Sequence, residues 1–171
     1  PCLLKAASRN QARGFSDIAL FEAGPVFVGG EPSDQDFQIS GLLVGQTTKK
    51  NVHSKTRNID IFDVKADVEV TLAALGASKK VQISRGGNSW WHPRRHGCIC
   101  LGPKTVLAIF GEVHPKVLKE IDVKGPAVAF TIWPNSIPIP RNKKSTRSAL
   151  DLVYLQAVER DFAFIVDNKV E

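Results

Sequence analysis

Two of the four histidines stand directly before a proline, and histidine is the side chain best suited to acid–base or metal chemistry near neutral pH. His92 and Pro93 lie in WWHPRRHG, and His114 and Pro115 lie in FGEVHPKVLKEI. A metal site needs a third ligand, and the sequence contains neither an HxH nor an HExxH spacing. The pattern therefore favours a structural role for both histidines over a metal site or an acid–base pair, and we expect no metal.

No side chain is marked as a nucleophile. The GxSxG pattern is absent, and the three cysteines Cys2, Cys98 and Cys100 match neither a disulfide framework nor a zinc motif. Cys98 and Cys100 would point to the same face of a strand. We interpret them as small apolar residues in a reducing cytoplasm.

Local signals explain why a proline follows each histidine. Pro115 suits the first position of a helix, where its missing N–H costs nothing, so His114 is predicted to be the N-cap. Gly111 would allow the sharp entry into this helix. Pro93 follows an apolar aromatic pair, and it predicts the end of one extended segment and the start of a turn.

The elements that must position these residues are short strands with a few helices. Helices are predicted at 3–14, 60–77 and 114–121, and the second has an apolar stripe at helical spacing: Ile61, Val64, Val68, Leu72 and Leu75. Strands are predicted at 17–24, 25–30, 37–46, 126–133 and 160–167, with a hairpin over 98–111 that turns at Gly102 and a loop at 52–58. The fold class is therefore α+β, with a mainly antiparallel β-sheet flanked by helices.

Composition and charge narrow the class of protein. The 171 residues include 43% hydrophobic residues, and no apolar run approaches the roughly 20 residues of a membrane span, so we expect a cytoplasmic protein without membrane association. The net charge of +6 weakly favours an acidic partner such as RNA. Residues 134–150 are rich in proline and polar side chains, which is typical of a linker, and they hold the candidate RNA contacts Arg141, Lys143, Lys144 and Arg147.

Four segments in one order resemble the beta subunit of bacterial phenylalanyl-tRNA synthetase: ALFEAGPVF, WWHPRRHGCICLG, FGEVHPKVLKEIDVKGPAVAF and RDFAFIVD. The resemblance implies a C-terminal fragment of that longer chain. Residues 1–133 would form a domain like a class II aminoacyl-tRNA synthetase core. Residues 134–150 would be a basic linker, and 151–171 the truncated start of a ferredoxin-like anticodon-binding domain. The HPGRSA-like turn of the family falls on His92, Pro93, Arg95 and Gly97, with Arg94 and His96 replacing glycine and serine.

The resemblance also implies that the core-like domain is catalytically silent. Class II sites carry an arginine two residues before the motif 2 glutamate; if Glu22 is that glutamate, Leu20 fills the arginine position. Near the end of the domain, Ser136 takes the place of the second arginine and Asn135 that of a glutamate, while Thr131 and Trp133 replace glycines. The fragment itself would then be no enzyme and hold no cofactor.

The implied role is therefore that of a partner in a larger enzyme. The complex, with a catalytic alpha subunit and tRNA(Phe) as partners, would join phenylalanine to the tRNA using ATP and magnesium. The terminal, half-polar helix from Leu3 to Arg13 is the predicted contact with another chain. Two alternatives remain: a basic RNA-binding module outside the synthetases, and a histidine-dependent enzyme.

Overall fold

The computed structural model describes residues 1–48, 52, 55–77, 80–139, 156 and 158–167, in two units that divide between Ile139 and Pro140. The first unit is built on a six-stranded sheet in which every neighbouring pair is antiparallel, in the order β1-β2-β6-β5-β4-β3. This arrangement confirms the prediction of an α+β fold with an antiparallel sheet. In chain order the elements are α1 (Cys2–Ala12), β1 (Ile18–Phe27), β2 (Gln35–Val44), α2 (Ile61–Ala74), β3 (Gln82–Ser84), β4 (Trp91–Leu101), β5 (Thr105–Val113), α3 (Pro115–Ile121), β6 (Ala127–Ile132) and the 3-10 turn η1 (Pro134–Ser136).

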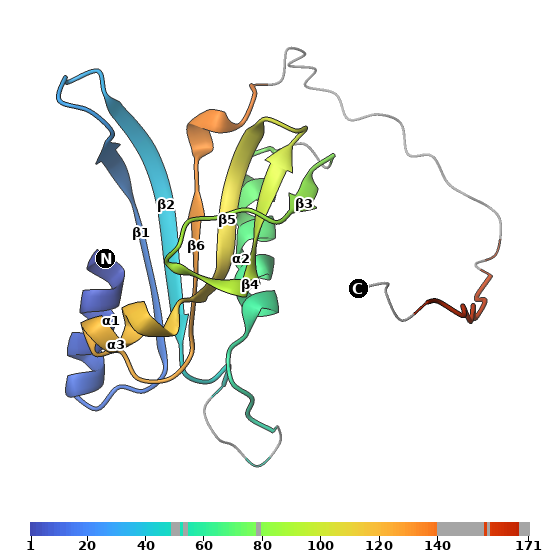
Figure 1. Cartoon of the computed structure of the whole chain (residues 1–171), viewed down its shortest axis with the longest axis horizontal. Helices are drawn as coiled ribbons and strands as arrows, with labels where there is room; N and C mark the ends of the chain where they lie inside the picture. The colour runs from blue at the N-terminus through green and yellow to red at the C-terminus, as the bar shows by residue number, and fades with distance from the viewer. Residues whose placement is uncertain (49–51, 53–54, 78–79, 140–155, 157, 168–171) are drawn as a thin grey trace. The chain divides into compact units, whose positions relative to one another are not determined.

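The helices cover the sheet unequally. Helix α2 packs on β5 and β6, whereas α1 and α3 lie side by side near one end of β1 and β2 (Figure 1). Alternate residues of a strand point to opposite faces, so Val128 of β6 joins the core under α2 while its neighbour Ala127 joins the core under α1 and α3. The sheet therefore has a buried core on each face.

Helix α2 begins with a capping box. The Asp60 side chain accepts hydrogen bonds from the backbone N–H groups of Phe62 and Asp63, and the Asp63 side chain accepts from the Asp60 N–H. Three of the otherwise unpaired backbone donors at the helix start are thereby satisfied.

The predicted apolar stripe of α2 is largely confirmed. Val64, Val68 and Leu72 are buried against the sheet, and Ile61 packs beside them. Leu75 does not belong to this stripe: it is the C-cap and is 41% exposed, because the helical phase ends at Ala74.

Two predictions about prolines were wrong, and one short strand was missed. Strand β1 runs unbroken through Gly24 and Pro25, because it is an edge strand in which Pro25 needs no donor on its open side. Strand β4 begins at Trp91 and runs through WHPRRHG instead of turning at Pro93, because a register shift between Trp91 and His96 accommodates the proline. The short β3 had not been predicted.

The second unit is described only at residues 156 and 158–167, and these carry no helix or strand. The strand predicted at 160–167 is therefore not formed, and Phe162, Phe164 and Ile165 are exposed. A strand needs a partner that accepts and donates its backbone hydrogen bonds.

Candidate functional site

The second histidine–proline pair starts α3, as predicted. The Nδ1 atom of His114 accepts a hydrogen bond from the Lys116 N–H at 3.1 Å, and Pro115 fills the first helical position. The backbone N–H of His114 also donates to the Trp90 carbonyl at 2.8 Å. The two segments that contain the histidine–proline pairs are therefore neighbours, held together through the backbone.

The first histidine–proline pair is engaged with its own strand. His92 accepts at Nδ1 from the Arg94 N–H at 3.2 Å, and its carbonyl lies 2.6 Å from Nδ1 of His96. His96 pairs with Gly111 of β5, where a Cβ would lie 2.5 Å from the His96 Cβ and 2.7 Å from the Arg95 carbonyl oxygen. Gly111 thus permits a close approach of two strands, and not the sharp helix entry that we predicted.

An ion pair crosses the same two strands. The Arg95 guanidinium donates to both carboxylate oxygens of Glu112, with a distance of 2.9 Å from Nη2 to Oε1. Gly97, two residues further along β4, pairs with Phe110. Among the described residues, no three histidine, cysteine, aspartate or glutamate side chains are grouped so that they could hold a metal ion.

The two thiols of β4 are buried, as the sequence predicted. The Cys98 and Cys100 sulfur atoms lie 3.6 Å apart, and Ser84 Oγ lies 3.0 Å from the Cys98 sulfur. Burial raises the pKa of the Cys100 thiol. A thiol that is kept protonated in this way is a poor nucleophile.

A groove of about 840 Å³ lies on the face of the sheet that carries α1 and α3. Its walls are mainly apolar and come from both helices, the β1–β2 hairpin and the Trp90–Trp91 segment: Leu3, Leu4, Val26, Phe27, Trp90, Trp91, Val113, Val117 and Ile121. Polar side chains line it only at Glu22, Gln38, Ser40 and Thr131, apart from the thiol of Cys2. Neither lysine nor arginine is among the lining residues.

The residues predicted to occupy lost arginine positions lie outside this groove. Leu20 of β1 packs against the core under α1 and α3, and Ser136 lies in η1. Glu22 and Thr131, in contrast, both line the groove. The candidate RNA contacts Arg141, Lys143, Lys144 and Arg147 lie outside the described residues.

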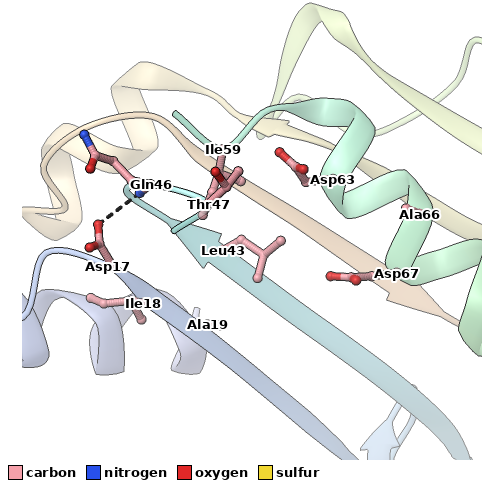
Figure 2. Close-up of a pocket in the computed structure, with 10 residues that line it drawn as sticks. All are labelled: Asp17, Ile18, Ala19, Leu43, Gln46, Thr47, Ile59, Asp63, Ala66 and Asp67. Carbon is pink, nitrogen blue, oxygen red and sulfur yellow. Dashed lines mark hydrogen bonds between the residues drawn. The ribbon is translucent and has the colours of Figure 1, made fainter. Parts of the chain in front are cut away.

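A second cavity, of about 560 Å³, opens between β1, β2 and α2 (Figure 2). Three aspartates line it: Asp63 and Asp67, one turn apart on α2, and Asp17, which directly precedes β1. Only the fold brings Asp17 close to the other two. Asp17 accepts from the Gln46 N–H at 3.0 Å, and Asp63 caps α2. Hydrogen bonds from Arg57 lower the pKa of Asp63, whereas burial, followed by the charge of Asp63, raises the pKa of Asp67.

Large apolar side chains are exposed on the β1–β2 hairpin. Phe21 is 79% exposed, Phe27 is 71% exposed and Phe37 is 40% exposed. Pro25 pairs with Phe37, and Gly41 pairs with Phe21, so the alternation of side chains puts Phe21, Pro25, Phe27 and Phe37 on one face. Because β1 is the edge strand, Pro25 and Phe27 also border the groove. We call these four residues the hairpin patch.

No described helix is both long and apolar enough to cross a bilayer.

The fold is similar to that of a solved aminoacyl-tRNA synthetase. A solved pyrrolysyl-tRNA synthetase, PylSc of Desulfitobacterium hafniense, superimposes with a TM-score of 0.53 at 14% identity, over 77% of this chain and 44% of that one. The likeness at this identity concerns the fold alone. The particular family follows from sequence: residues 1–133 match the family model described as the phenylalanyl tRNA synthetase beta chain CLM domain.

Relatives over the whole chain agree with this match. The chain is 65% identical over 171 residues to the phenylalanine–tRNA ligase beta subunit of Ruegeria pomeroyi and 59% identical to that of Cereibacter sphaeroides, covering 100% of this chain and 21% of each relative. The Rhodospirillum rubrum subunit is 45% identical over 172 residues. The chain belongs to the phenylalanine–tRNA ligase beta subunit family, and it spans about a fifth of the length of these relatives.

Proposed function

We propose that this chain is a non-catalytic, interface-forming part of a phenylalanine–tRNA ligase beta subunit. It supports the charging of tRNA(Phe), which an alpha subunit carries out with ATP and magnesium, and it binds neither cofactor itself. The observation that carries the proposal is the charge of the groove: its lining includes the carboxylate Glu22 but neither lysine nor arginine.

The physical reason lies in the transition state of adenylate formation. Negative charge develops on the α-phosphate as a carboxylate attacks it, and preorganised positive charge stabilises that transition state. Removing one such donor typically costs roughly 100- to 1000-fold in rate. The groove offers no lysine or arginine side chain to such a phosphate. Leu20 and Ser136, which lie outside the groove, carry no charge either, so both contributions are missing.

A pyrophosphate-exchange assay tests this proposal. The purified chain, with phenylalanine, ATP and magnesium, is expected to give the same exchange as a sample without protein. Exchange that persists through further purification and disappears on unfolding would contradict the proposal, and would make His92 and His114 catalytic candidates again.

We also propose where the alpha subunit binds. Helix α1 remains a candidate, but its Leu3, Leu4 and Ala7 already pack inward. The hairpin patch offers a better apolar surface, because exposed apolar residues in one contiguous area are typical of interfaces. A single partner would contact both α1 and the hairpin patch only by reaching around the edge strand β1.

Co-purification with a tagged alpha subunit tests the hairpin patch. The double substitution Phe21→Ser and Phe37→Ser is expected to abolish capture, because both side chains are substantially exposed and their removal costs the fold little. Phe62→Ser is the matched control, since Phe62 is 71% exposed but lies on α2. Capture of the double variant at the wild-type level would refute this assignment.

A further inference from the structure

The groove beneath α1 and α3 has a polar row on its floor. Glu22 pairs with Ser40, and Ser40 pairs with Thr131, so these three residues cross β1, β2 and β6 in register. The hydroxyl oxygens of Ser40 and Thr131 lie 3.3 Å apart. One row away on the same face, Leu42 and Ala129 are apolar, as expected for residues that face a core. The polar row is therefore a local departure from the pattern of its own strands.

The shape of the groove suits a small molecule. Its volume of about 840 Å³ falls within the roughly 300–1,000 Å³ of typical ligand sites. Aromatic and aliphatic side chains form the walls, and a few polar groups converge on one strip of the floor. This combination of an apolar enclosure and a short polar strip is the usual composition of a site that binds and orients a ligand.

The charged and polar side chains that line the groove indicate which kind of small molecule it would bind. Among the side chains that line the groove, Glu22 supplies the single carboxylate, and no lysine, arginine or histidine is present to hold an anion. The one cationic group of the lining is the amino terminus at Pro1, and acetylation removes its charge. An ionised carboxylate accepts hydrogen bonds but cannot donate them, and the two hydroxyls can accept as well. An ammonium group donates three hydrogen bonds and would satisfy these acceptors, and hydrogen bonds between charged groups are stronger than neutral ones.

We propose that this groove binds a small amphipathic cation, namely an aromatic or branched aliphatic group that carries an ammonium. The apolar part lies between the side chains of α1 and α3 and the Trp90–Trp91 segment, and the ammonium lies at Glu22 and Ser40. This proposal is separate from the role in the ligase, because it needs neither ATP, nor tRNA, nor an alpha subunit.

Three probes of nearly equal shape test the proposal. Benzylammonium, benzyl alcohol and benzoate differ mainly in charge. Each is titrated to about 10 mM into the 171-residue chain with its amino terminus acetylated, because the Pro1 ammonium would otherwise add a positive charge to the groove. The indole and backbone NMR signals are followed. We expect benzylammonium to bind about tenfold more tightly than benzyl alcohol, and benzoate to bind most weakly. The shifted signals should be those of Trp90, Trp91 and the residues of the polar row.

Two substitutions localise the effect. Glu22→Gln keeps the shape of an exposed side chain and removes the charge, and it is expected to reduce benzylammonium binding about tenfold while leaving benzyl alcohol unchanged. Thr131→Val is expected to weaken benzylammonium by a smaller factor. Glu69→Gln is the control, because it removes the same charge from the outer side of α2.

Each unfavourable outcome overturns the proposal. No binding of benzylammonium would show that the groove is not a cation site. Benzoate binding as tight as that of benzylammonium would refute the argument from charge. An equal loss in the Glu22→Gln and Glu69→Gln variants would show a general electrostatic effect in place of a site.

Discussion

Substitution of Gly111 by alanine should destabilise the fold by forcing β4 and β5 apart. The new Cβ would lie 2.5 Å from the His96 Cβ, 2.6 Å from the His96 Cα and 2.7 Å from the Arg95 carbonyl oxygen. Two of these three atoms belong to the backbone, so no change of side-chain rotamer relieves the overlap. Carbon atoms prefer separations of about 3.5 Å or more, and the strands must therefore separate by roughly 1 Å.

The expected cost is about 2–3 kcal/mol, at the upper end of the range for overpacked sites, because ladder hydrogen bonds are stretched as well. For a domain of this size that corresponds to a fall of about 5–10 °C in Tm. Urea unfolding followed by circular dichroism measures the free energy directly.

Gly24→Ala is the matched control for this experiment. Gly24 also lies in a strand, and nothing lies within 4 Å of the position that its Cβ would take. Alanine there should be neutral, or stabilising by up to about 1 kcal/mol, because glycine is the more costly residue in a strand. If Gly111→Ala were as stable as Gly24→Ala, the close approach of β4 and β5 would be refuted.

Two further substitutions probe single side chains. Asp63→Asn should lower the free energy of unfolding at neutral pH. Hydrogen bonds from Arg57 lower the pKa of Asp63 in the folded state, so the Asp63 carboxylate stabilises the fold above its unfolded-state pKa of about 4. This stabilisation is lost as the pH falls through the lower folded-state pKa, and the wild type and the Asp63→Asn variant should then be equally stable. A difference in their free energies of unfolding that persists in acid, measured by urea titration, would contradict this. His114→Ala should cost about 0.5–2 kcal/mol through loss of the α3 cap, and His114→Asn should restore most of it; equal destabilisation by both would argue against capping.

Sequence patterns predicted the elements that have strong local signals. The spacing of Val64, Val68 and Leu72 identified α2, and the histidine–proline pair identified the start of α3. The prolines in strands misled the prediction, because Pro25 is tolerated on an edge and Pro93 at an irregular register. Both circumstances depend on which strand lies alongside, and a single sequence does not give this information.

The candidate site was harder to predict than the fold. Glu22, Ser40 and Thr131 come from three strands, and two of them are separated by about 90 residues along the chain. The strand register alone makes them neighbours. The family resemblance singled out Glu22 and Thr131 as positions aligned with a glutamate and a glycine of class II sites. No sequence pattern pointed to Ser40 or to the residues that form the walls of the groove.

The strand order has a consequence for the route of folding. Strands β4, β5 and β6 are joined by short connections, whereas the pairing of β2 with β6 brings together segments about 80 residues apart. Closing a flexible loop of that length costs roughly 4 kcal/mol of chain entropy before any contact between β2 and β6 repays it. We therefore expect the β4–β5–β6 half, with α3, to assemble first, and the β1–β2 hairpin to dock late. The rate of folding should therefore depend on residues that pair β2 with β6. The groove forms only when the β1–β2 hairpin docks on β6, because β1 and β2 supply part of its lining.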